Sequence, residues 1–362
     1  MDARRFLDAV GDDVQDPLAT GDDPVTAPPV QLAQGHPAGN RGRVGSRGGK
    51  LNMAHRNPVG VLVSIIAVLG ALLTVSPLIA EAQGVLYDDF SDTHLDATKW
   101  IGFQVAAGSF TGSPLEITRK IHQGTGPLSG KLELSHRMVG GLAPSSGQES
   151  RNRLTLRNIA FMPGPAGPVP NFAGVEFDVL PRHFETAGCP TPTAVPTRVR
   201  AGFNHQMFND PAVLNTGGST GNVGAVVELR RNSTSPDRPR TIPAVGILYR
   251  CQNADCTQTV SVTVDLGPVT RGEEVRLKTR WQPELNGVSF QKNDEASMFV
   301  SYAGPPFNVG PTLDEISNPI KPAGSFFKAL DVVALAPACA EQPTEADITA
   351  LFDNVVVLPL VP

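Results

Sequence analysis

Aromatic and charged side chains are both scarce in this chain. Only 6% of the 362 residues are aromatic, with two tryptophans and three tyrosines, and 18% are charged. The 30 lysines and arginines are outnumbered by 35 acidic residues, for a net charge of −5. Because no basic excess exists to attract phosphates, we exclude a nucleic-acid partner. The 40% of hydrophobic residues still suffice for a full core.

Stretches that would suit a long helix are also rare. The 36 glycines and 33 prolines make up nearly a fifth of the chain. Both residues destabilise the interior of a helix, whereas turns accommodate them. We therefore expect many turns and short strands.

Motifs for several kinds of active site are absent. The seven histidines are scattered, and no two of them have the spacing of metal ligands. No phosphate-binding loop, dinucleotide fingerprint or nucleophile elbow is present. We expect no cofactor, apart from the structural calcium considered below.

One hydrophobic run, residues 59–80, contains no charge. His55 and Arg56 precede it, and Ala80-Glu81-Ala82 follows it. A basic start, an apolar middle and a small-x-small end are typical of a secretory signal peptide, so we assign residues 53–82 to one and predict cleavage after Ala82. The mature protein would be secreted, periplasmic or on the cell surface. Because the run is long enough to span a bilayer, an uncleaved membrane anchor is the alternative, and membrane contact is expected only in that case.

Residues 1–52 are rich in Gly, Pro, Asp and Arg and show no hydrophobic period, which is typical of a disordered segment. A signal peptide belongs at an N-terminus, not fifty residues along the chain. We hypothesise that translation starts at Met53, the alternative being a disordered cytoplasmic tail.

Residues 83–362 read as strands separated by turns. Lys131–Ser135, Arg153–Arg157 and Val175–Val179 each alternate polar and apolar residues. A period of two gives each strand one core face and one solvent face, and strands without interleaved helices form antiparallel sheets in a sandwich or barrel. Trp281 ends such a run and is expected in the core. We predict one helical turn over Thr344–Ile348, with Thr344 as its cap.

Four cysteines, Cys189, Cys251, Cys256 and Cys339, all follow the hydrophobic run. An even number in an exported chain predicts two disulfides. The four residues between Cys251 and Cys256 read as a turn between two strands, so we expect a local bridge there and a long-range Cys189–Cys339 bridge. The alternative, a four-cysteine zinc site, requires paired two-residue spacings that this chain lacks.

The two ends of this region resemble a known superfamily. Leu86-Tyr87-Asp88-Asp89-Phe90-Ser91, with Lys99-Trp100 after it, resembles the first strands of the concanavalin A-like lectin/glucanase superfamily, and Ala350–Val357 resembles its last strand. Gly272–Trp281 through Phe299–Tyr302 is similar to its late pair of strands. The resemblance implies that residues 83–362 form one all-β, antiparallel, two-sheet jelly-roll sandwich whose first and last strands pair. This fold hosts lectins, hydrolases and adhesion modules, so it implies no single activity.

The hydrolase branch can be tested on its catalytic pattern. Laminarinase-like members carry Glu-x-Asp-x-x-Glu, in which the first Glu is the nucleophile and the last is the acid/base. Glu176 and Asp178 fit the first two positions as weak catalytic candidates, but Pro181 occupies the third. Without that acid no proton donor serves the leaving oxygen, so we expect no glycosidase activity. The simpler interpretation places Glu176 and Asp178 on the solvent face of one strand.

Two further groups of residues are candidates for a site. In Phe203–Asp210, amides and acids lie beside aromatic rings, a combination suited to sugars, and we select Asn204, His205, Asn209 and Asp210 as ligand-binding candidates. An ordinary strand end followed by a turn is the alternative. Asp89 and Asp353, with Asp88, would meet if the first and last strands pair, and the resemblance makes them weak calcium candidates.

We therefore predict an exported, non-catalytic binding protein whose partner is an extracellular glycan. The alternatives are a divergent glycoside hydrolase or lyase, and a structural component of the cell envelope.

Overall fold

The structure is a computed structural model that describes part of the chain. The described residues are 84–102, 105–110, 115–142, 148–156, 172–191, 193, 195–210, 218–234, 240–254, 256, 258–310 and 328–359. They include no helix that is long and apolar enough to cross a membrane. The predicted signal peptide and residues 1–52 lie outside them, so both remain predictions.

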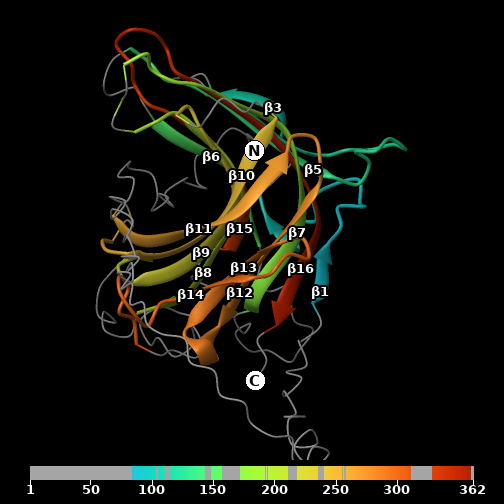
Figure 1. The fold of residues 1–362 in the computed structure, drawn as a ribbon. Helices are drawn as coiled ribbons and strands as arrows, with labels where there is room; N and C mark the ends of the chain where they lie inside the picture. Colours follow the sequence, from blue (N-terminus) through green and yellow to red (C-terminus); the bar gives the residue numbers. More distant parts are fainter. Residues whose placement is uncertain are drawn as a thin grey trace, which may run out of the picture. The chain divides into compact units, whose positions relative to one another are not determined.

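Two antiparallel sheets make up the described region (Figure 1). The strands of sheet A are β1 (Val85–Asp88), β3 (Val105–Phe110), β4 (Leu115–Ile121), β5 (Leu132–Val139), β7 (Phe172–Ala187), β12 (Val275–Gln282), β13 (Gly287–Lys292), β14 (Met298–Ser301) and β16 (Glu345–Pro359). They follow the order β14-β13-β12-β7-β16-β5-β4-β3, and β1 pairs with β16. A single 3-10 turn, Pro283–Leu285, joins β12 to β13 within the described residues.

Sheet B contains seven strands. They are β2 (Trp100–Ile101), β6 (Gln148–Leu156), β8 (Arg198–Asn209), β9 (Asn222–Asn232), β10 (Thr241–Cys251), β11 (Thr259–Thr270) and β15 (Lys328–Ala336). Their order is β11-β10-β9-β8-β15-β6-β2. Neighbours such as β15 and β8 are more than a hundred residues apart in sequence, which is typical of a jelly roll.

The core lies between the two sheets because alternate residues of each strand face inward. In β5, Leu132, Leu134, His136 and Met138 are buried, while Glu133, Ser135 and Arg137 between them are partly exposed. Phe177 from sheet A packs on Phe203 from sheet B, with ring centroids 6.2 Å apart. The predicted all-β, two-sheet sandwich is confirmed, and Trp281 lies in its core as expected.

The first and last strands pair as the superfamily resemblance implies. In the β1–β16 ladder, Leu86 lies opposite Val356. Just beyond it, the buried Trp100 indole donates a 2.6 Å hydrogen bond to Asp88. The late strands are also present, since β13 pairs with β12 on one side and with β14 on the other.

The helical turn predicted over Thr344–Ile348 is wrong. Strand β16 begins at Glu345, and its first residues alternate between partly exposed and buried. The Thr344 hydroxyl donates to the Pro337 carbonyl at 2.5 Å and caps no helix. Pairing of β16 with both β5 and β7 outweighs the local capping signal.

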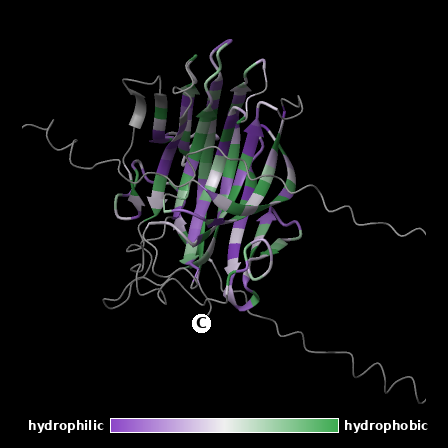
Figure 2. Cartoon of the chain, turned by 90° about the vertical axis from the view of Figure 1, so that its left-hand side faces the viewer, coloured by the Kyte–Doolittle hydropathy of each residue, from purple (hydrophilic) through white to green (hydrophobic). Residues whose placement is uncertain are grey.

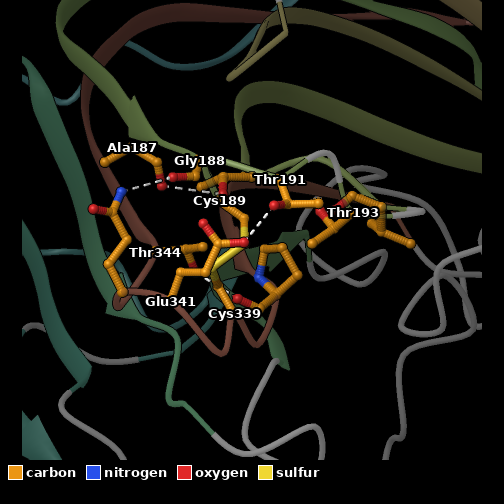
Figure 3. Close-up of a disulfide and its surroundings, with 12 residues drawn as sticks. Ala187, Gly188, Cys189, Thr191, Thr193, Cys339, Glu341 and Thr344 are labelled. Carbon is orange, nitrogen blue, oxygen red and sulfur yellow. Dashed lines mark hydrogen bonds between the residues drawn. A yellow bond between two sulfur atoms is a disulfide. The ribbon is translucent and has the colours of Figure 1, made fainter.

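Both predicted disulfides are present. Cys251–Cys256 joins the end of β10 to the turn before β11, and Cys189–Cys339 links two positions 150 residues apart. Figure 3 shows the second bridge, beside which the Thr191 hydroxyl donates to the Glu341 carboxylate. Both bridges use all four cysteines, so no thiolate remains for the alternative zinc site.

Candidate functional site

The outer face of sheet B carries most of the sheet's polar side chains. On β8, Val199, Ala201 and Phe203 join the core, so the residues between them face outward. The same alternation along β8 places Arg198, Arg200, Asn204 and Gln206 on the outward side. Figure 2 shows strands on which hydrophilic and hydrophobic residues are mixed in this way. Long polar runs facing away from the core make this face the candidate site.

A charged group spans four neighbouring strands, β6, β15, β8 and β9. We call it the arginine cluster; it comprises Glu149, Arg151 and Arg153 of β6, Asp331 of β15, Arg198 and Arg200 of β8, and Glu228 and Arg230 of β9. Its members come from residues 149–331 of the chain and meet only because the jelly roll brings these strands together.

Glu149 is the best-connected carboxylate of the arginine cluster. It accepts hydrogen bonds from Arg151 at 2.5 Å and from Arg200 at 2.9 Å, and Arg198 lies 3.8 Å away. Burial alone would raise its pKa, but the charges of Arg200, Arg151 and Arg198 outweigh burial and lower that pKa to about 2. Glu149 is therefore a carboxylate at any physiological pH and holds no proton to donate.

The other two carboxylates of the cluster are also bound by arginines. Glu228 accepts a 2.6 Å hydrogen bond from Arg230 and lies 3.7 Å from Arg200. Asp331 lies 3.4 Å from Arg153 and 3.8 Å from Arg151. Arginines thus link all three carboxylates into one network across the sheet.

Further along the same face, amides form a second network. Asn209 donates to Asn222 at 3.0 Å, and Asn222 donates to Gln206 at 3.3 Å. The Tyr249 hydroxyl donates to Asn204 at 2.9 Å. All five side chains are buried, so their polar groups form hydrogen bonds within the protein and not with open solvent.

The four ligand-binding candidates predicted from sequence do not come together. Asn204 and Asn209 belong to the amide network, but His205 faces the sandwich interior. Its ring stacks on Phe172, with centroids 4.7 Å apart, and both ring nitrogens are buried. Asp210 follows β8 and accepts a 2.9 Å hydrogen bond from Arg250. A ligand site made of all four residues remains a prediction that this placement does not favour.

The weak catalytic candidates lie on the other sheet. Glu176 and Asp178 are on β7, where Arg276 of β12 lies 3.4 Å from Glu176 and donates to Asp178 at 2.9 Å. Asn354 also donates to Asp178, at 2.9 Å. Pro181, at the position of the missing third acid, pairs with Ala350 beside an irregularity in the β7–β16 ladder, where a residue without an N–H is tolerated.

The predicted calcium ligands do not fit a calcium site. The Asp353 carboxylate is 2.8 Å from the Lys131 ammonium, and that of Asp89 accepts hydrogen bonds from Ser91. The Asp88 carboxylate accepts the hydrogen bond of the Trp100 indole. Within the described ranges, no three His, Cys, Asp or Glu side chains are grouped so as to hold a metal.

Sequence reasoning missed the arginine cluster. Its signal was the alternation itself, since Arg151 and Arg153, Arg198 and Arg200, and Glu228 and Arg230 are each two residues apart and so share a strand face. The sequence does not say which strands lie side by side, so the three pairs could not be joined.

No family model and no curated protein matches this chain. Similar solved structures include a GH16 protein of Bacteroides ovatus in complex with a mixed-linkage glucan product, at 8% identity and a TM-score of 0.31, covering 73% of this chain and 98% of that one. An immunostimulatory antigen and pseudo-β-1,3-glucanase of Mycobacterium tuberculosis is 14% identical, with a TM-score of 0.32 and coverage of 75% and 99%. Winged bean acidic lectin in complex with methyl-α-D-galactose is 11% identical, with a TM-score of 0.28 and coverage of 77% and 100%.

The fold assignment does not depend on these similarities. The jelly-roll sandwich rests on the strand order of the two sheets and on the pairing of the first strand with the last. The resemblance to the concanavalin A-like lectin/glucanase superfamily remains a prediction, because TM-scores of 0.31 and 0.28 carry no argument for it.

Proposed function

We propose that this protein is exported and binds a carbohydrate on the outer face of sheet B without cleaving it. The observation that carries this proposal is the arginine cluster on that face, in which the side chains of Arg153 and Arg230 are 18% and 21% exposed. Guanidinium groups donate several hydrogen bonds in a fixed plane, which suits the hydroxyl and acidic groups of sugars. The two disulfides support export, because such bonds persist in oxidising compartments.

The charges of the candidate carboxylates support binding over cleavage. A glycosidase needs one carboxyl that carries a proton near neutral pH and a second that stays ionised. Glu149 is held ionised by three arginines, and Glu228 and Asp331 lie against arginines too. Glu176 and Asp178 share Arg276 on the opposite sheet. Of these carboxylates, Glu149 is excluded as the proton donor, because its arginines lower its pKa to about 2.

A glycan panel tests this function with the full chain. We expect binding to at least one extracellular polysaccharide, weakened in Arg230→Gln and unchanged in Arg276→Gln, which removes an ion-paired arginine from sheet A. Reducing-sugar and unsaturated-product assays run in parallel. Turnover that survives purification would favour a hydrolase or lyase, and a chain that binds no glycan would favour the structural role in the envelope.

A further inference from the structure

In the arginine cluster the carboxylates are the more deeply buried groups, and three of the guanidinium groups lie nearer the solvent. The side chains of Glu149 and Glu228 are 3% and 2% exposed, and that of Asp331 is 7% exposed. Those of Arg153, Arg198 and Arg230 are 18%, 12% and 21% exposed. Each of these arginines reaches solvent more than the carboxylate it binds. Among the described residues of this face, the charge that meets the solvent is therefore positive.

Three of the arginines lie in one row across the sheet. In the strand registers, Arg151 of β6 and Arg200 of β8 both lie opposite Val333 of β15, and Arg200 lies opposite Arg230 of β9. Neighbouring strands are about 4.8 Å apart, so the row extends across roughly 14 Å perpendicular to the strands. In this row Arg230 is 21% exposed, whereas Arg151 and Arg200 are each 8% exposed. A linear ligand that crosses the strands would therefore contact Arg230 directly and pass over the positive charge of the other two.

The carboxylates hold these guanidinium groups in place before any ligand arrives. Glu149 anchors Arg151 and Arg200, and Glu228 anchors Arg230. An arginine that is already fixed loses little side-chain entropy when it binds a ligand, and its planar fork matches a carboxylate or sulfate in two parallel hydrogen bonds.

We propose that the ligand is an anionic polysaccharide, bearing carboxylate or sulfate groups, that lies across β6, β15, β8 and β9 on the arginine row. This inference rests on the proposed carbohydrate-binding function and names its ligand class. The five arginines of the arginine cluster outnumber its three carboxylates, so the cluster carries two net positive charges, which an anionic chain compensates and a neutral glucan does not.

The test measures binding of the full chain by calorimetry to polygalacturonate and alginate as carboxylated chains, dextran sulfate as a sulfated chain, and neutral laminarin and dextran. We expect binding to a carboxylated or sulfated chain that weakens as NaCl rises, with neutral chains at least tenfold weaker. Comparison of the carboxylated and sulfated arms identifies the anionic group. Single-stranded DNA is included as a non-glycan polyanion, and we expect it to bind more weakly than the preferred glycan.

Matched variants locate the binding. Arg230→Gln and Arg153→Gln each remove one partly exposed guanidinium, and we expect each to weaken binding about tenfold, the usual effect of losing one hydrogen bond to a charged group. Arg230→Lys keeps the positive charge but loses the planar fork of the guanidinium group. We expect its affinity to lie between those of the wild type and Arg230→Gln. Arg276→Gln on sheet A should change nothing. Unfolding curves of all variants identify any that fail to fold, and binding is compared only among folded ones.

Each alternative outcome has one meaning. Binding to neutral glycans alone overturns the anionic ligand and leaves the carbohydrate-binding function standing. Binding to no glycan overturns both. The site on sheet B is overturned if Arg230→Gln and Arg153→Gln leave anionic binding unchanged, or if Arg276→Gln weakens it equally. It is also overturned if DNA binds as tightly as the preferred glycan.

Discussion

His205 is a titratable side chain that is fully shielded from water. It faces the sandwich interior, fully buried, between Phe172 of β7 and Phe203 of β8, and its register partner on β15 is Lys328. Burial, and then the positive charge of Lys328, lower the pKa of His205 well below 6.5. The ring is therefore neutral in the folded protein, whereas in the unfolded chain it takes up a proton near its ordinary pKa.

This difference predicts an acid-sensitive fold. Below about pH 6.5 the unfolded state binds a proton that the folded state does not, so the free energy of unfolding falls by up to about 1.4 kcal/mol per pH unit from this group. We expect His205→Leu to remove that part of the slope, measured by urea unfolding between pH 7.5 and 5. His94→Gln, at an exposed histidine, is the control. An identical slope in wild type and His205→Leu would contradict the prediction.

The inward orientation of His205 could have been read from the sequence, whereas that of its partner could not. Phe203 and His205 are two residues apart in an alternating strand, so they share a face, and an aromatic core residue marks that face as internal. The prediction of a binding segment over Phe203–Asp210 did not separate this face from the opposite one, on which Asn204 and Gln206 lie. The approach of Lys328 depends on the β8–β15 register, which tertiary packing sets.

At the scale of elements, a glycine of β9 leaves room for a tyrosine of the neighbouring strand β10. Gly224 lies opposite Tyr249 in the ladder, and a Cβ on Gly224 would lie 2.5 Å from the tyrosine ring and its hydroxyl. The missing side chain lets Tyr249 lie flat over β9 and reach Asn204 on β8. The Cys251–Cys256 bridge packs in the same small apolar cluster as the tyrosine.

We expect Gly224→Ala to lower the free energy of unfolding by about 1–3 kcal/mol, the usual cost of overpacking. The same substitution in a Tyr249→Leu background should cost less, because the ring that it would meet is gone, and a double-mutant cycle in urea measures the difference. Gly126→Ala, where a Cβ would meet no atom within 4 Å, should change stability by less than about 0.5 kcal/mol. Equal costs in both backgrounds would show that Gly224 serves backbone conformation and not Tyr249.

Elements with clean alternation were predictable, and their partners were not. Of the predicted strand Lys131–Ser135, all but Lys131 lies within β5, and Val175–Val179 lies within β7. The segment of Thr344 was misread because a local capping signal carries no information about strands β5 and β7 on either side. For the same reason the network around Glu149, Glu228 and Asp331 could not be predicted, because their strands become neighbours only in the folded sheet.

At the scale of the whole molecule, the jelly roll is held together by contacts between distant parts of the sequence. Strand β16, at the end of the chain, lies between β5 and β7 and also pairs with β1. Cys189–Cys339 fixes the region after β7 to the region between β15 and β16, two segments 150 residues apart. This bridge limits how far the unfolded chain can expand.

The two disulfides should therefore differ in what they contribute to stability. Closing a 150-residue loop lowers the entropy of the unfolded chain enough to stabilise the fold by about 5 kcal/mol, whereas closing the five-residue Cys251–Cys256 loop contributes about 2 kcal/mol. We expect the paired substitution Cys189→Ser/Cys339→Ser to lower the free energy of unfolding in urea more than Cys251→Ser/Cys256→Ser does. The m-value should rise in the first variant, because its unfolded chain exposes more surface. If the short bridge proved the more costly to lose, packing against Tyr249 and its neighbours on sheet B would outweigh chain entropy in setting the stability of this fold.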